Sequence, residues 1–498
     1  NSNGEDLGCQ VFYATALSRS GTCFVGRLSV EGKYLAVNKK YPIVVSSDGS
    51  DSNAATNELT GSAQNGRAYG AIKVDAPGAA TDTGTETLGT AKSLCTAHTQ
   101  AGINVAMVQR SYYAGWRTLS NWSQDPGTPA IAVASGDDHS CALMADTTVR
   151  CWGSNWHDQL GNNSTPDSLV PIRVFESGTT PLSGVTAISA SGHHTCALLL
   201  DTTVRCWGSN ANGELGDNST TDSVVPVVVT GLSGVTAISL GSEYSCALLT
   251  DTVQCWGANG RGQLGNNSTA ESHVPVDVIT APGVALQHVT AIGAGVYHAC
   301  ALTDAQTVYC WGFNVVGQLG NNSTAESHVP VQVVGPGGAG YLSGVAAIGA
   351  GGYHSCALSV LGAIRCWGSN GEGELGDGTN TDASVPVPPG GTPTGGATAL
   401  STGGFHSCVV IAGGVVQCWG YNSSGQLGSN TRTNSNVPVA VVGPGGSAFS
   451  GAIAISTGSY HTCALMAGGA VQCWGSNVYG ELGDNSTANS SVPVTVLL

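Results

Sequence analysis

The sequence predicts a mainly β protein, namely a seven-bladed β-propeller preceded by a small α+β or β-rich domain. A Cys-Trp-Gly core recurs seven times at spacings of 55, 49, 55, 56, 52 and 55 residues, with its tryptophans at Trp152, Trp207, Trp256, Trp311, Trp367, Trp419 and Trp474. A nearly constant period of this size is typical of solenoids, propellers and arrays. No window within the repeats shows a helical period. Each unit is therefore expected to consist of strands.

One repeat unit contains four candidate strands, which in the clearest copy cover residues 185–189, 194–200, 204–208 and 225–229. These segments are short, rich in β-branched and aromatic residues, and bounded by Gly, Asn, Asp and Ser. Four strands cannot bury both faces of their own sheet, so neighbouring units must stack. Seven such units that close radially make a propeller, which leaves only short, protected edges.

The repeat does not extend into residues 1–128, which we expect to form a separate domain, whereas residues 129–498 form the propeller. Within the first domain, strands are expected over 11–17, 23–30, 41–46, 68–74, 105–110 and 114–119. A stretch rich in Ser, Asn, Gly and Thr predicts a loop over 48–66. One helix is expected over 87–102.

Fourteen of the 17 cysteines occur as one pair per repeat, and both members lie on consecutive strands. Six pairs are ten residues apart and the third is nine apart, because its turn is one residue shorter. A shorter turn still lets the two strand positions face each other, which favours seven disulfides across hairpins. The predicted pairs are Cys141 with Cys151, Cys196 with Cys206, Cys246 with Cys255, Cys300 with Cys310, Cys356 with Cys366, Cys408 with Cys418, and Cys463 with Cys473.

Two other interpretations of these cysteines stay open. The recurring His-x-Cys, for example His194 and Cys196, could hold a metal, although it lacks the four-ligand spacing of zinc modules. Free buried thiols are the other alternative. Disulfides persist in oxidising compartments, so the first interpretation predicts a secreted, extracellular or cell-surface protein. The first domain holds Cys9, Cys23 and Cys95, an odd number that suggests an intermolecular bond or a free thiol. The alternative is a buried, unpaired cysteine.

The repeat pattern G-x-x-H-[ST]-C-A-L, then C-W-G-x-N-x-x-G-[QE]-L-G, then V-P-V, resembles the regulator of chromosome condensation repeat family. The resemblance covers residues 130–498 and implies a seven-bladed propeller. Members with this pattern include a nuclear guanine-nucleotide exchange factor, ligase-associated domains and a secreted inhibitor of β-lactamase. Since fold does not determine function, the resemblance leaves the activity open.

The formal net charge of −16 lies entirely in the repeats, which hold six Arg, no Lys and 22 acidic residues, whereas residues 1–128 hold ten basic and ten acidic residues. This charge excludes nucleic acid as a partner, because no basic footprint exists. It also disfavours anionic membrane surfaces, and no apolar run approaches the ~20 residues of a membrane helix. The chain begins at Asn1 without Met, so we expect a processed, mature product.

A histidine recurs at one repeat position, with Tyr244 in the third copy; its members are His139, His194, His298, His354, His406 and His461. A residue present in nearly every blade is expected to tie blades together, because catalysis needs one asymmetric constellation. No catalytic residue, metal site or cofactor is predicted.

The residues that vary between blades are better candidates for binding. Tyr297, Tyr353, Phe405 and Tyr460 directly precede the histidine in four neighbouring blades, and Trp156 and Tyr479 vary at a second position. Aromatic side chains on the rim of a rigid ring suit protein recognition. The alternative is that these rings pack between blades.

Five Asn-Ser-Thr sequons occur in expected turns and make candidate glycan acceptors of Asn163, Asn218, Asn267, Asn322 and Asn485. Further sequons start at Asn121, Asn422 and Asn489. The alternative is that Asn-Ser-Thr simply forms good turns.

These features predict a non-enzymatic extracellular or cell-surface interaction protein, for which we favour a subunit of an extracellular assembly such as a filament or surface layer. The partner would be another copy of the chain, in a homo-oligomer, or another extracellular protein. One alternative is a secreted inhibitor or ligand-binding module that acts as a monomer. A guanine-nucleotide exchange factor is disfavoured by the acidic charge and the blade cysteines.

Overall fold

The computed structural model describes residues 128–390 and 396–498 and, within residues 1–127, a set of short strands. The chain divides into two compact units, Asn1–Gly127 and Thr128–Leu498. In the part of the chain that is described, no helix is both long and apolar enough to cross a membrane.

The strands of the first unit form one larger sheet and two hairpins. The larger sheet has the order β1 (Ser18–Ser20), β2 (Cys23–Gly26), β9 (Asn104–Met107), β7 (Gly70–Ala76) and β8 (Ala79–Thr81), with β2 parallel to β9. The hairpins pair β3 (Tyr41–Val45) with β4 (Ala55–Leu59) and β5 (Ala63–Gln64) with β6 (Arg67–Ala68).

Four expected strands of the first unit have counterparts in β2, β3, β7 and β9. The loop expected over 48–66 is wrong, since it contains β4 and β5. The polar segment of β4 is a strand because it pairs with β3, and β structure depends on such pairing more than on composition. The helix expected over 87–102 and the strands expected over 11–17 and 114–119 lie outside the described residues.

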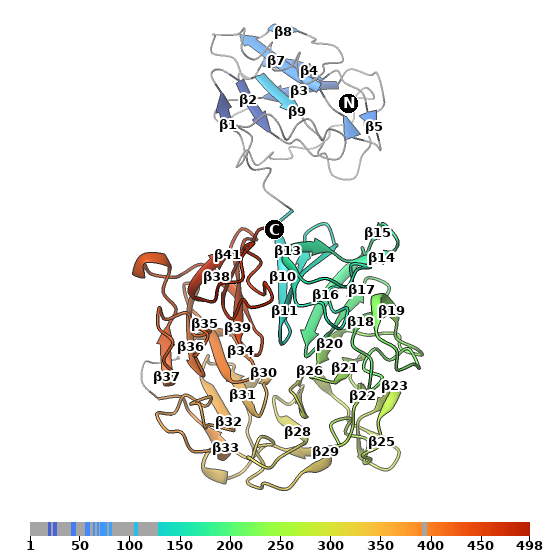
Figure 1. Ribbon diagram of the computed structural model, residues 1–498, viewed down its shortest axis with the longest axis vertical. Helices are drawn as coiled ribbons and strands as arrows, with labels where there is room; N and C mark the ends of the chain where they lie inside the picture. The colour runs from blue at the N-terminus through green and yellow to red at the C-terminus, as the bar shows by residue number, and fades with distance from the viewer. Residues whose placement is uncertain are drawn as a thin grey trace. The chain divides into compact units, whose positions relative to one another are not determined.

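Each of the seven blades is a four-stranded antiparallel sheet made from one continuous stretch of chain, and we call its strands A to D in chain order. Figure 1 shows the seven sheets arranged round a common axis. Blades 1 to 3 are β10 (Ala130–Ser135), β11 (His139–Met144), β12 (Val149–Gly153) and β13 (Ser168–Arg173); β16 (Val185–Ser191), β17 (His194–Leu199), β18 (Val204–Gly208) and β19 (Ser223–Val228); and β20 (Ala237–Leu240), β21 (Tyr244–Leu248), β22 (Val253–Gly257) and β23 (Ser272–Asp277). Blades 4 and 5 are β26 (Val289–Ala294), β27 (His298–Thr303), β28 (Val308–Gly312) and β29 (Ser327–Gln332); and β30 (Val345–Ala350), β31 (His354–Ser359), β32 (Ile364–Gly368) and β33 (Ala383–Val387). Blades 6 and 7 are β34 (Ala397–Thr402), β35 (His406–Ile411), β36 (Val415–Gly420) and β37 (Ser435–Ala440); and β38 (Ala452–Thr457), β39 (His461–Met466), β40 (Val471–Gly475) and β41 (Ser490–Thr495).

The predicted seven-bladed propeller is confirmed, including the four strands expected in the second copy, which are β16 to β19. Short accessory elements lie between blades: the hairpins β14 (Phe175–Ser177) with β15 (Thr180–Pro181) and β24 (Ile279–Ala281) with β25 (Val284–Ala285), and the 3-10 turns η2 (Pro336–Gly338) and η3 (Pro444–Gly446).

The ring closes by packing between blades 7 and 1, which lie side by side in Figure 1. The last strand, β41, pairs with β40 of its own blade. Just beyond it, Val496 is buried in one core cluster with Trp152 of blade 1. The indole Nε1 of Trp152 donates to the carbonyl of Glu481 at 2.8 Å. Closure therefore uses the same kind of contact as every other blade junction.

That contact is the recurring tryptophan, which is fully buried in all seven blades. Each indole Nε1 donates to a backbone carbonyl of the preceding blade, for example Trp367 to Gln318 at 2.9 Å. The glycine that ends the N-x-x-G-[QE]-L-G turn leaves space for the indole of this tryptophan. A Cβ on Gly320, whose φ is +65°, would lie 2.7 Å from the Trp367 Nε1, so only glycine fits there.

The seven predicted disulfides are confirmed, one within each blade. They join Cys141 to Cys151, Cys196 to Cys206, Cys246 to Cys255, Cys300 to Cys310, Cys356 to Cys366, Cys408 to Cys418, and Cys463 to Cys473. In every blade the two cysteines are directly opposite residues of strands B and C. The shorter turn of the third blade leaves this register intact, as expected. The metal interpretation of the His-x-Cys pattern is wrong, because these cysteines are bonded to each other, and the free-thiol interpretation is wrong for the same reason.

The recurring histidines form a chain of hydrogen bonds round the propeller and are fully buried. In six blades, Nε2 lies 2.8 Å from a Ser or Thr hydroxyl of the next blade. Each hydroxyl in turn donates to a carbonyl of the preceding blade, as Ser245 does to Glu214 at 2.9 Å. The hydroxyl therefore accepts from Nε2–H. Burial lowers the pKa of these histidines and keeps their rings neutral. The prediction that this position ties blades together is confirmed.

The junction between blades 3 and 4 replaces both partners of this bond. Blade 3 has Tyr244 where the other blades have histidine, and blade 4 has Ala299 where the others have Ser or Thr. The Tyr244 hydroxyl instead donates to the backbone carbonyl of His298 at 2.6 Å. The longer side chain reaches the main chain of the next blade, so the missing hydroxyl leaves no buried group unpaired.

We expect Tyr244→His to lower the free energy of unfolding by about 1–3 kcal/mol, because the new Nε2–H would be buried opposite a methyl group. Adding Ala299→Ser restores the acceptor found at the other junctions, and the double variant should regain most of this loss. Urea unfolding of the two variants checks the prediction. A double variant no more stable than Tyr244→His would contradict the pairing.

Candidate binding face

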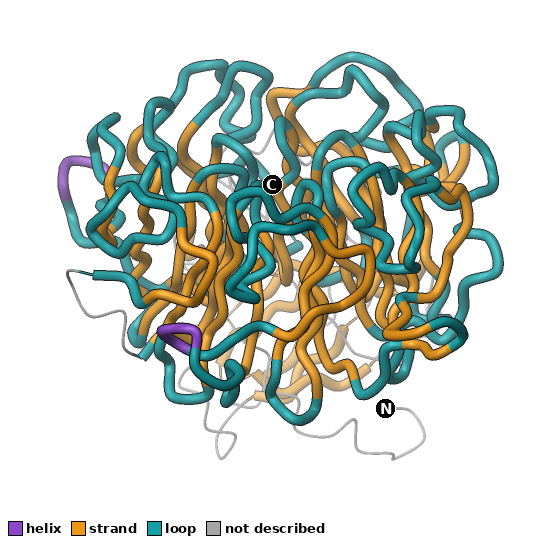
Figure 2. The backbone as a smooth tube through the Cα atoms, turned by 90° about the horizontal axis from the view of Figure 1, so that it is seen from below, coloured by secondary structure: helices purple, strands orange, loops and turns teal. Residues whose placement is uncertain are grey.

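The turns between strands A and B and the loops between strands C and D lie at the same end of every blade, because each blade is an antiparallel A-B-C-D meander. We call this end the AB/CD face. Figure 2 shows the strands standing between two layers of loops. Backbone bonds tie the first residue of each CD loop to its AB turn, as Phe313 N–H to the carbonyl of Tyr297 at 2.9 Å. The residue after Cys-Trp-Gly is thereby held beside the residue that precedes the histidine.

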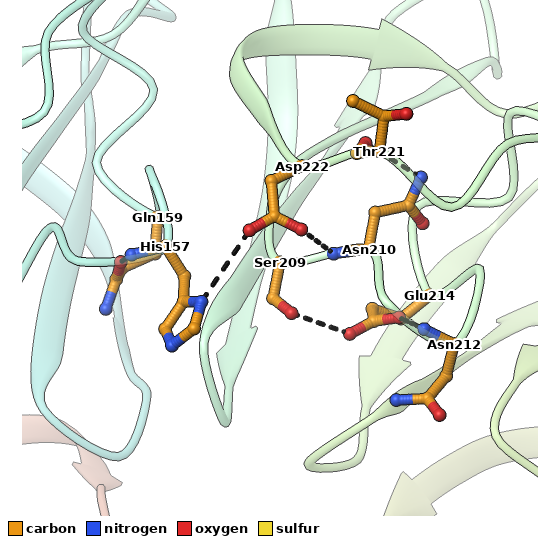
Figure 3. Close-up of polar contacts among 8 residues, drawn as sticks. All are labelled: His157, Gln159, Ser209, Asn210, Asn212, Glu214, Thr221 and Asp222. Atoms are coloured by element: carbon orange, nitrogen blue, oxygen red, sulfur yellow. Dashed lines mark hydrogen bonds and ion pairs between the residues drawn. The ribbon is translucent and has the colours of Figure 1, made fainter.

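A buried asparagine organises each CD loop. In blade 2, the Asn210 Oδ1 accepts from Leu215 N–H. The Asn210 Nδ2 donates to the carbonyl of Thr221, as Figure 3 shows. The Asp222 carboxylate accepts from Asn210 N–H at 2.8 Å. Glu214 accepts from the Ser209 hydroxyl at 2.9 Å. The Asn210 side chain makes four of the hydrogen bonds that hold this loop.

The five candidate glycan acceptors lie at one position of the CD loops, exposed and with positive φ between 57° and 66°. Their N–H groups donate to the outer strand region of the next blade, as Asn267 does to His328 at 2.9 Å. Gly378 takes this position in blade 5 with φ +85°. A left-handed turn residue is thus required here, which supports the turn interpretation, and the asparagine side chains are exposed to solvent.

One further sequon is not an acceptor. Asn422 is fully buried, and its Nδ2 donates to the carbonyls of Thr431 and Thr433. It is the organising asparagine of blade 6, so a glycan cannot be attached there. Asn121 lies outside the described residues.

Four of the six predicted rim residues form two separate aromatic clusters on the AB/CD face. In the Tyr297 cluster, Tyr297, Tyr353 and Phe313 have ring centroids 6.1–6.2 Å apart. In the Tyr460 cluster, Phe405, Tyr460 and Tyr421 have centroids 5.6–6.2 Å apart. The rings pack across blade boundaries, yet they stay partly exposed, so packing between blades and a surface role are compatible.

Phe313 and Tyr421 complete the two clusters and are not among the rim residues predicted from the sequence. Both directly follow Cys-Trp-Gly, where the other five blades have serine or alanine. Two large aromatic residues at an otherwise small position were the available signal.

The remaining two rim residues join neither cluster. Trp156 is 77% exposed on the CD loop of blade 1. Tyr479 is half-buried on the CD loop of blade 7, and its N–H donates to the buried carboxylate of Glu481.

An arginine of this chain lies over the Tyr297 cluster. The guanidinium carbon of Arg261 is 5.1 Å from the centroid of Phe313, within the range of a cation–π interaction. The same guanidinium donates to Glu326 at 3.1 Å. Arg261, Glu243 and the three rings line an open depression of about 600 Å³.

The AB/CD face is strongly acidic. Its turns and loops hold 16 of the 22 acidic residues of 129–498 and only two arginines, Arg261 and Arg432. Glu214, Glu374 and Glu481 are buried, and the other 13 acidic residues are at least partly exposed. The acidic residues are Asp137, Asp138, Asp158, Asp167, Glu214, Asp217, Asp222, Glu243, Glu271, Glu326, Glu372, Glu374, Asp377, Asp382, Glu481 and Asp484. A face of one sign attracts partners of the opposite sign.

Burial and this acidic surrounding change several pKa values in the same direction. Burial raises the pKa of Asp138, and the neighbouring Asp137 raises it further. The pKa of Tyr460 is raised first by burial and then by Tyr421, Asp137 and Asp138. Burial also raises the pKa of Glu214, Glu374 and Glu481. Among residues 128–390 and 396–498, no group of three or more His, Cys, Asp or Glu is placed to hold a metal.

Comparison with known proteins agrees with this geometry. Two sequence profiles of the regulator of chromosome condensation (RCC1) repeat match residues 148–198, 203–248, 251–302, 307–358 and 414–465, and residues 130–159, 185–214, 289–318, 345–374 and 452–481. Together they cover more than half of the chain.

The ultraviolet-B receptor UVR8 of Arabidopsis thaliana is 27% identical over 370 residues, which are 74% of this chain and 70% of the receptor. The probable E3 ubiquitin-protein ligase HERC6 of Homo sapiens is 33% identical over 350 residues, 68% of this chain but only 28% of the ligase.

Solved structures show the same fold. Human WBSCR16 superposes with a TM-score of 0.60 at 24% identity, over 70% of this chain and 95% of that one. Prp20p from Saccharomyces cerevisiae, whose binding properties to Gsp1p and histones are described with its structure, superposes with a TM-score of 0.55 at 22% identity, over 66% of this chain and 80% of Prp20p.

Proposed function

Because this chain belongs to the regulator of chromosome condensation (RCC1) repeat family, we propose that it is a non-enzymatic protein-interaction propeller, a subunit of an extracellular or cell-surface assembly. The observation that supports an interaction role best is the AB/CD face, where two aromatic clusters lie within a strongly acidic surface. Aromatic side chains on a rigid scaffold contribute most of the binding energy at many interfaces. The proteins that Prp20p binds give a precedent for binding by this fold.

The disulfides support the extracellular part of the proposal. All seven blades contain one, and the sulfur-bearing residues are at most 2% exposed. A set of structural disulfides this complete is typical of proteins that fold in an oxidising compartment. It also removes flexibility from each B–C hairpin, so the face is presented on a stiff frame.

The non-enzymatic part is supported by where the candidate groups lie. The six repeated histidines are buried in blade junctions, and their Nε2 atoms are engaged with hydroxyls. The ligase activity of HERC6 belongs to a protein of which this chain spans 28%. An interaction role fits the propeller that the two chains share.

The test is the oligomeric state of the native protein, followed on one sample by electrophoresis without reductant and by negative-stain microscopy. We expect polymers or ladders, with any bands that collapse on reduction reporting an intermolecular bond from Cys9, Cys23 or Cys95. A clean monomer would overturn the assembly role. The monomeric inhibitor or ligand-binding module would then be the function to pursue.

A further inference from the structure

The two aromatic clusters of the AB/CD face are built on equivalent positions of different blades. Phe313 and Tyr421 both follow Cys-Trp-Gly, and Tyr297 and Phe405 both precede the histidine. In each cluster, the third ring comes from the next blade, as Tyr353 and Tyr460. The two clusters are therefore two versions of one surface feature.

They differ at the position that holds the cation. The Tyr297 cluster has Arg261 over Phe313, and the guanidinium pairs with Glu326. At the equivalent position, two residues after the organising asparagine, the Tyr460 cluster has Glu372. Asn434 stands where Glu326 would be, and its Nδ2 donates to Glu372. A carboxylate has replaced the guanidinium in the same loop geometry.

Other negative charges lie beside the Tyr460 cluster. The hydroxyl of Ser459, next to Tyr460, donates to the Asp137 carboxylate at 2.7 Å. Asp137 and Asp138 both act on Tyr460 electrostatically. Arg432, the second arginine of this face, donates to the carbonyl of Asn489, and the cation–π contact that the structure records on this face is that of Arg261. Tyr460 is 37% exposed, so the cluster is open to a partner.

We propose that the Tyr460 cluster, with Glu372, Asp137 and Asp138, binds the guanidinium group of an arginine side chain supplied by a protein partner. The Tyr297 cluster shows the bound arrangement within this same chain: a guanidinium over the aromatic ring after Cys-Trp-Gly, held by a carboxylate. Arginine fits better than lysine, because its planar group stacks on a ring and still donates to a carboxylate. This inference rests on the proposed interaction role and names the chemistry of the partner.

The test uses the full-length protein and a tetra-arginine peptide amide, with binding and stoichiometry measured by isothermal titration calorimetry. The same peptide with citrulline, a neutral isostere, is the ligand control. We expect one site in the wild type and no binding of the citrulline peptide. Tyr421→Leu should lower the affinity for the arginine peptide roughly fivefold, which corresponds to the loss of one exposed cation–π contact.

The chain offers its own reciprocal variants. Glu372→Arg/Asn434→Glu copies the Arg261–Glu326 pair into the Tyr460 cluster, so an internal guanidinium should occupy the site and weaken the peptide at least tenfold. Arg261→Glu/Glu326→Asn opens the Tyr297 cluster and should add a second site. All four substitutions together keep the net charge, and they should move the single site from one cluster to the other.

The variant Asp251→Asn is the control for general electrostatic attraction between a basic peptide and an acidic protein. Asp251 is exposed in the turn between β21 and β22, at the opposite end of the blade, and this substitution changes the net charge by the same single unit as Glu372→Arg/Asn434→Glu. Unchanged affinity in Asp251→Asn is expected. An equal loss of affinity in Asp251→Asn and in Glu372→Arg/Asn434→Glu would overturn the proposed site. So would a Glu372→Arg/Asn434→Glu variant that binds the peptide like the wild type and unfolds at the same temperature. Neither result depends on the oligomeric state, which tests the interaction role separately.

Discussion

Reduction of the seven blade disulfides is expected to leave the propeller unfolded at room temperature. Each bond closes a hairpin of nine or ten residues, and such a cross-link stabilises a protein by about 3 kcal/mol, mainly by restricting the unfolded chain. Seven contributions of this size exceed the 5–15 kcal/mol by which a typical domain is stable. The repeats alone are therefore not expected to hold the ring together.

The measurement compares circular dichroism and thermal unfolding of the intact protein with those of protein denatured, reduced and returned to native buffer with thiol present. Thiol added to the native protein is the matched control, and we expect little effect, because the cysteines are at most 2% exposed. Removing one bond by Cys246→Ala/Cys255→Ala should cost about 3 kcal/mol. A fully reduced chain that melts within a few degrees of the intact one would contradict the prediction, and with it the main support for an oxidising compartment.

The propeller is also expected to lose stability steeply as the pH falls below about 6.5. Burial lowers the pKa of His194, His298 and His406 to about 3 and that of His354 and His461 to about 4, from an ordinary value of 6.5. The pKa of His139 is lowered in the same direction by burial and by neighbouring histidines. Between pH 6.5 and the folded-state pKa, these histidines are protonated in the unfolded chain but neutral in the folded chain. The free energy of unfolding therefore falls as the pH decreases through this window.

Each histidine that is neutral in the folded state and protonated in the unfolded state contributes about 1.4 kcal/mol per pH unit within the window. Five carboxyl groups act in the opposite sense, because a raised pKa makes the folded state gain stability as they protonate; they are those of Asp138, Asp158, Glu214, Glu374 and Glu481. These five groups offset only part of the effect of six histidines. Urea unfolding at pH 7.5, 6.5, 5.5 and 4.5 measures the net slope.

A matched control comes from the junction that uses tyrosine. The variant His354→Tyr/Ser407→Ala copies the Tyr244–Ala299 pair into another junction. The new tyrosine would lie against Gly351, which is equivalent to the Gly241 that leaves space for Tyr244. The variant should keep its stability at pH 7.5 and lose about 1.4 kcal/mol per pH unit of the acid dependence. An unchanged pH slope would show that the histidines do not cause the acid sensitivity.

The sequence by itself determined the number of blades, the four strands of each blade and the pairing of the fourteen repeat cysteines. These are local properties of one repeat: strands B and C are joined by a short hairpin, so Cys196 and Cys206 must face each other whatever the rest of the chain does. Seven copies of the same four-strand repeat strongly favour a seven-bladed propeller over other folds. The role of the repeated histidines followed from their presence in nearly every blade.

Only the tertiary structure decided which side chains meet between blades. The exchange of His and Ser for Tyr244 and Ala299 makes sense only when blade 3 is placed against blade 4. The six aromatic residues of the two clusters are present in the sequence, but their division into two clusters depends on contacts between non-equivalent positions, such as Phe313 with Tyr353. Arg261 likewise lies over Phe313 of the next blade, and Glu372 accepts a hydrogen bond from Asn434 of the next blade. A single repeat contains one side of each such contact, so the partner and the charge that surrounds it are defined only when the ring closes.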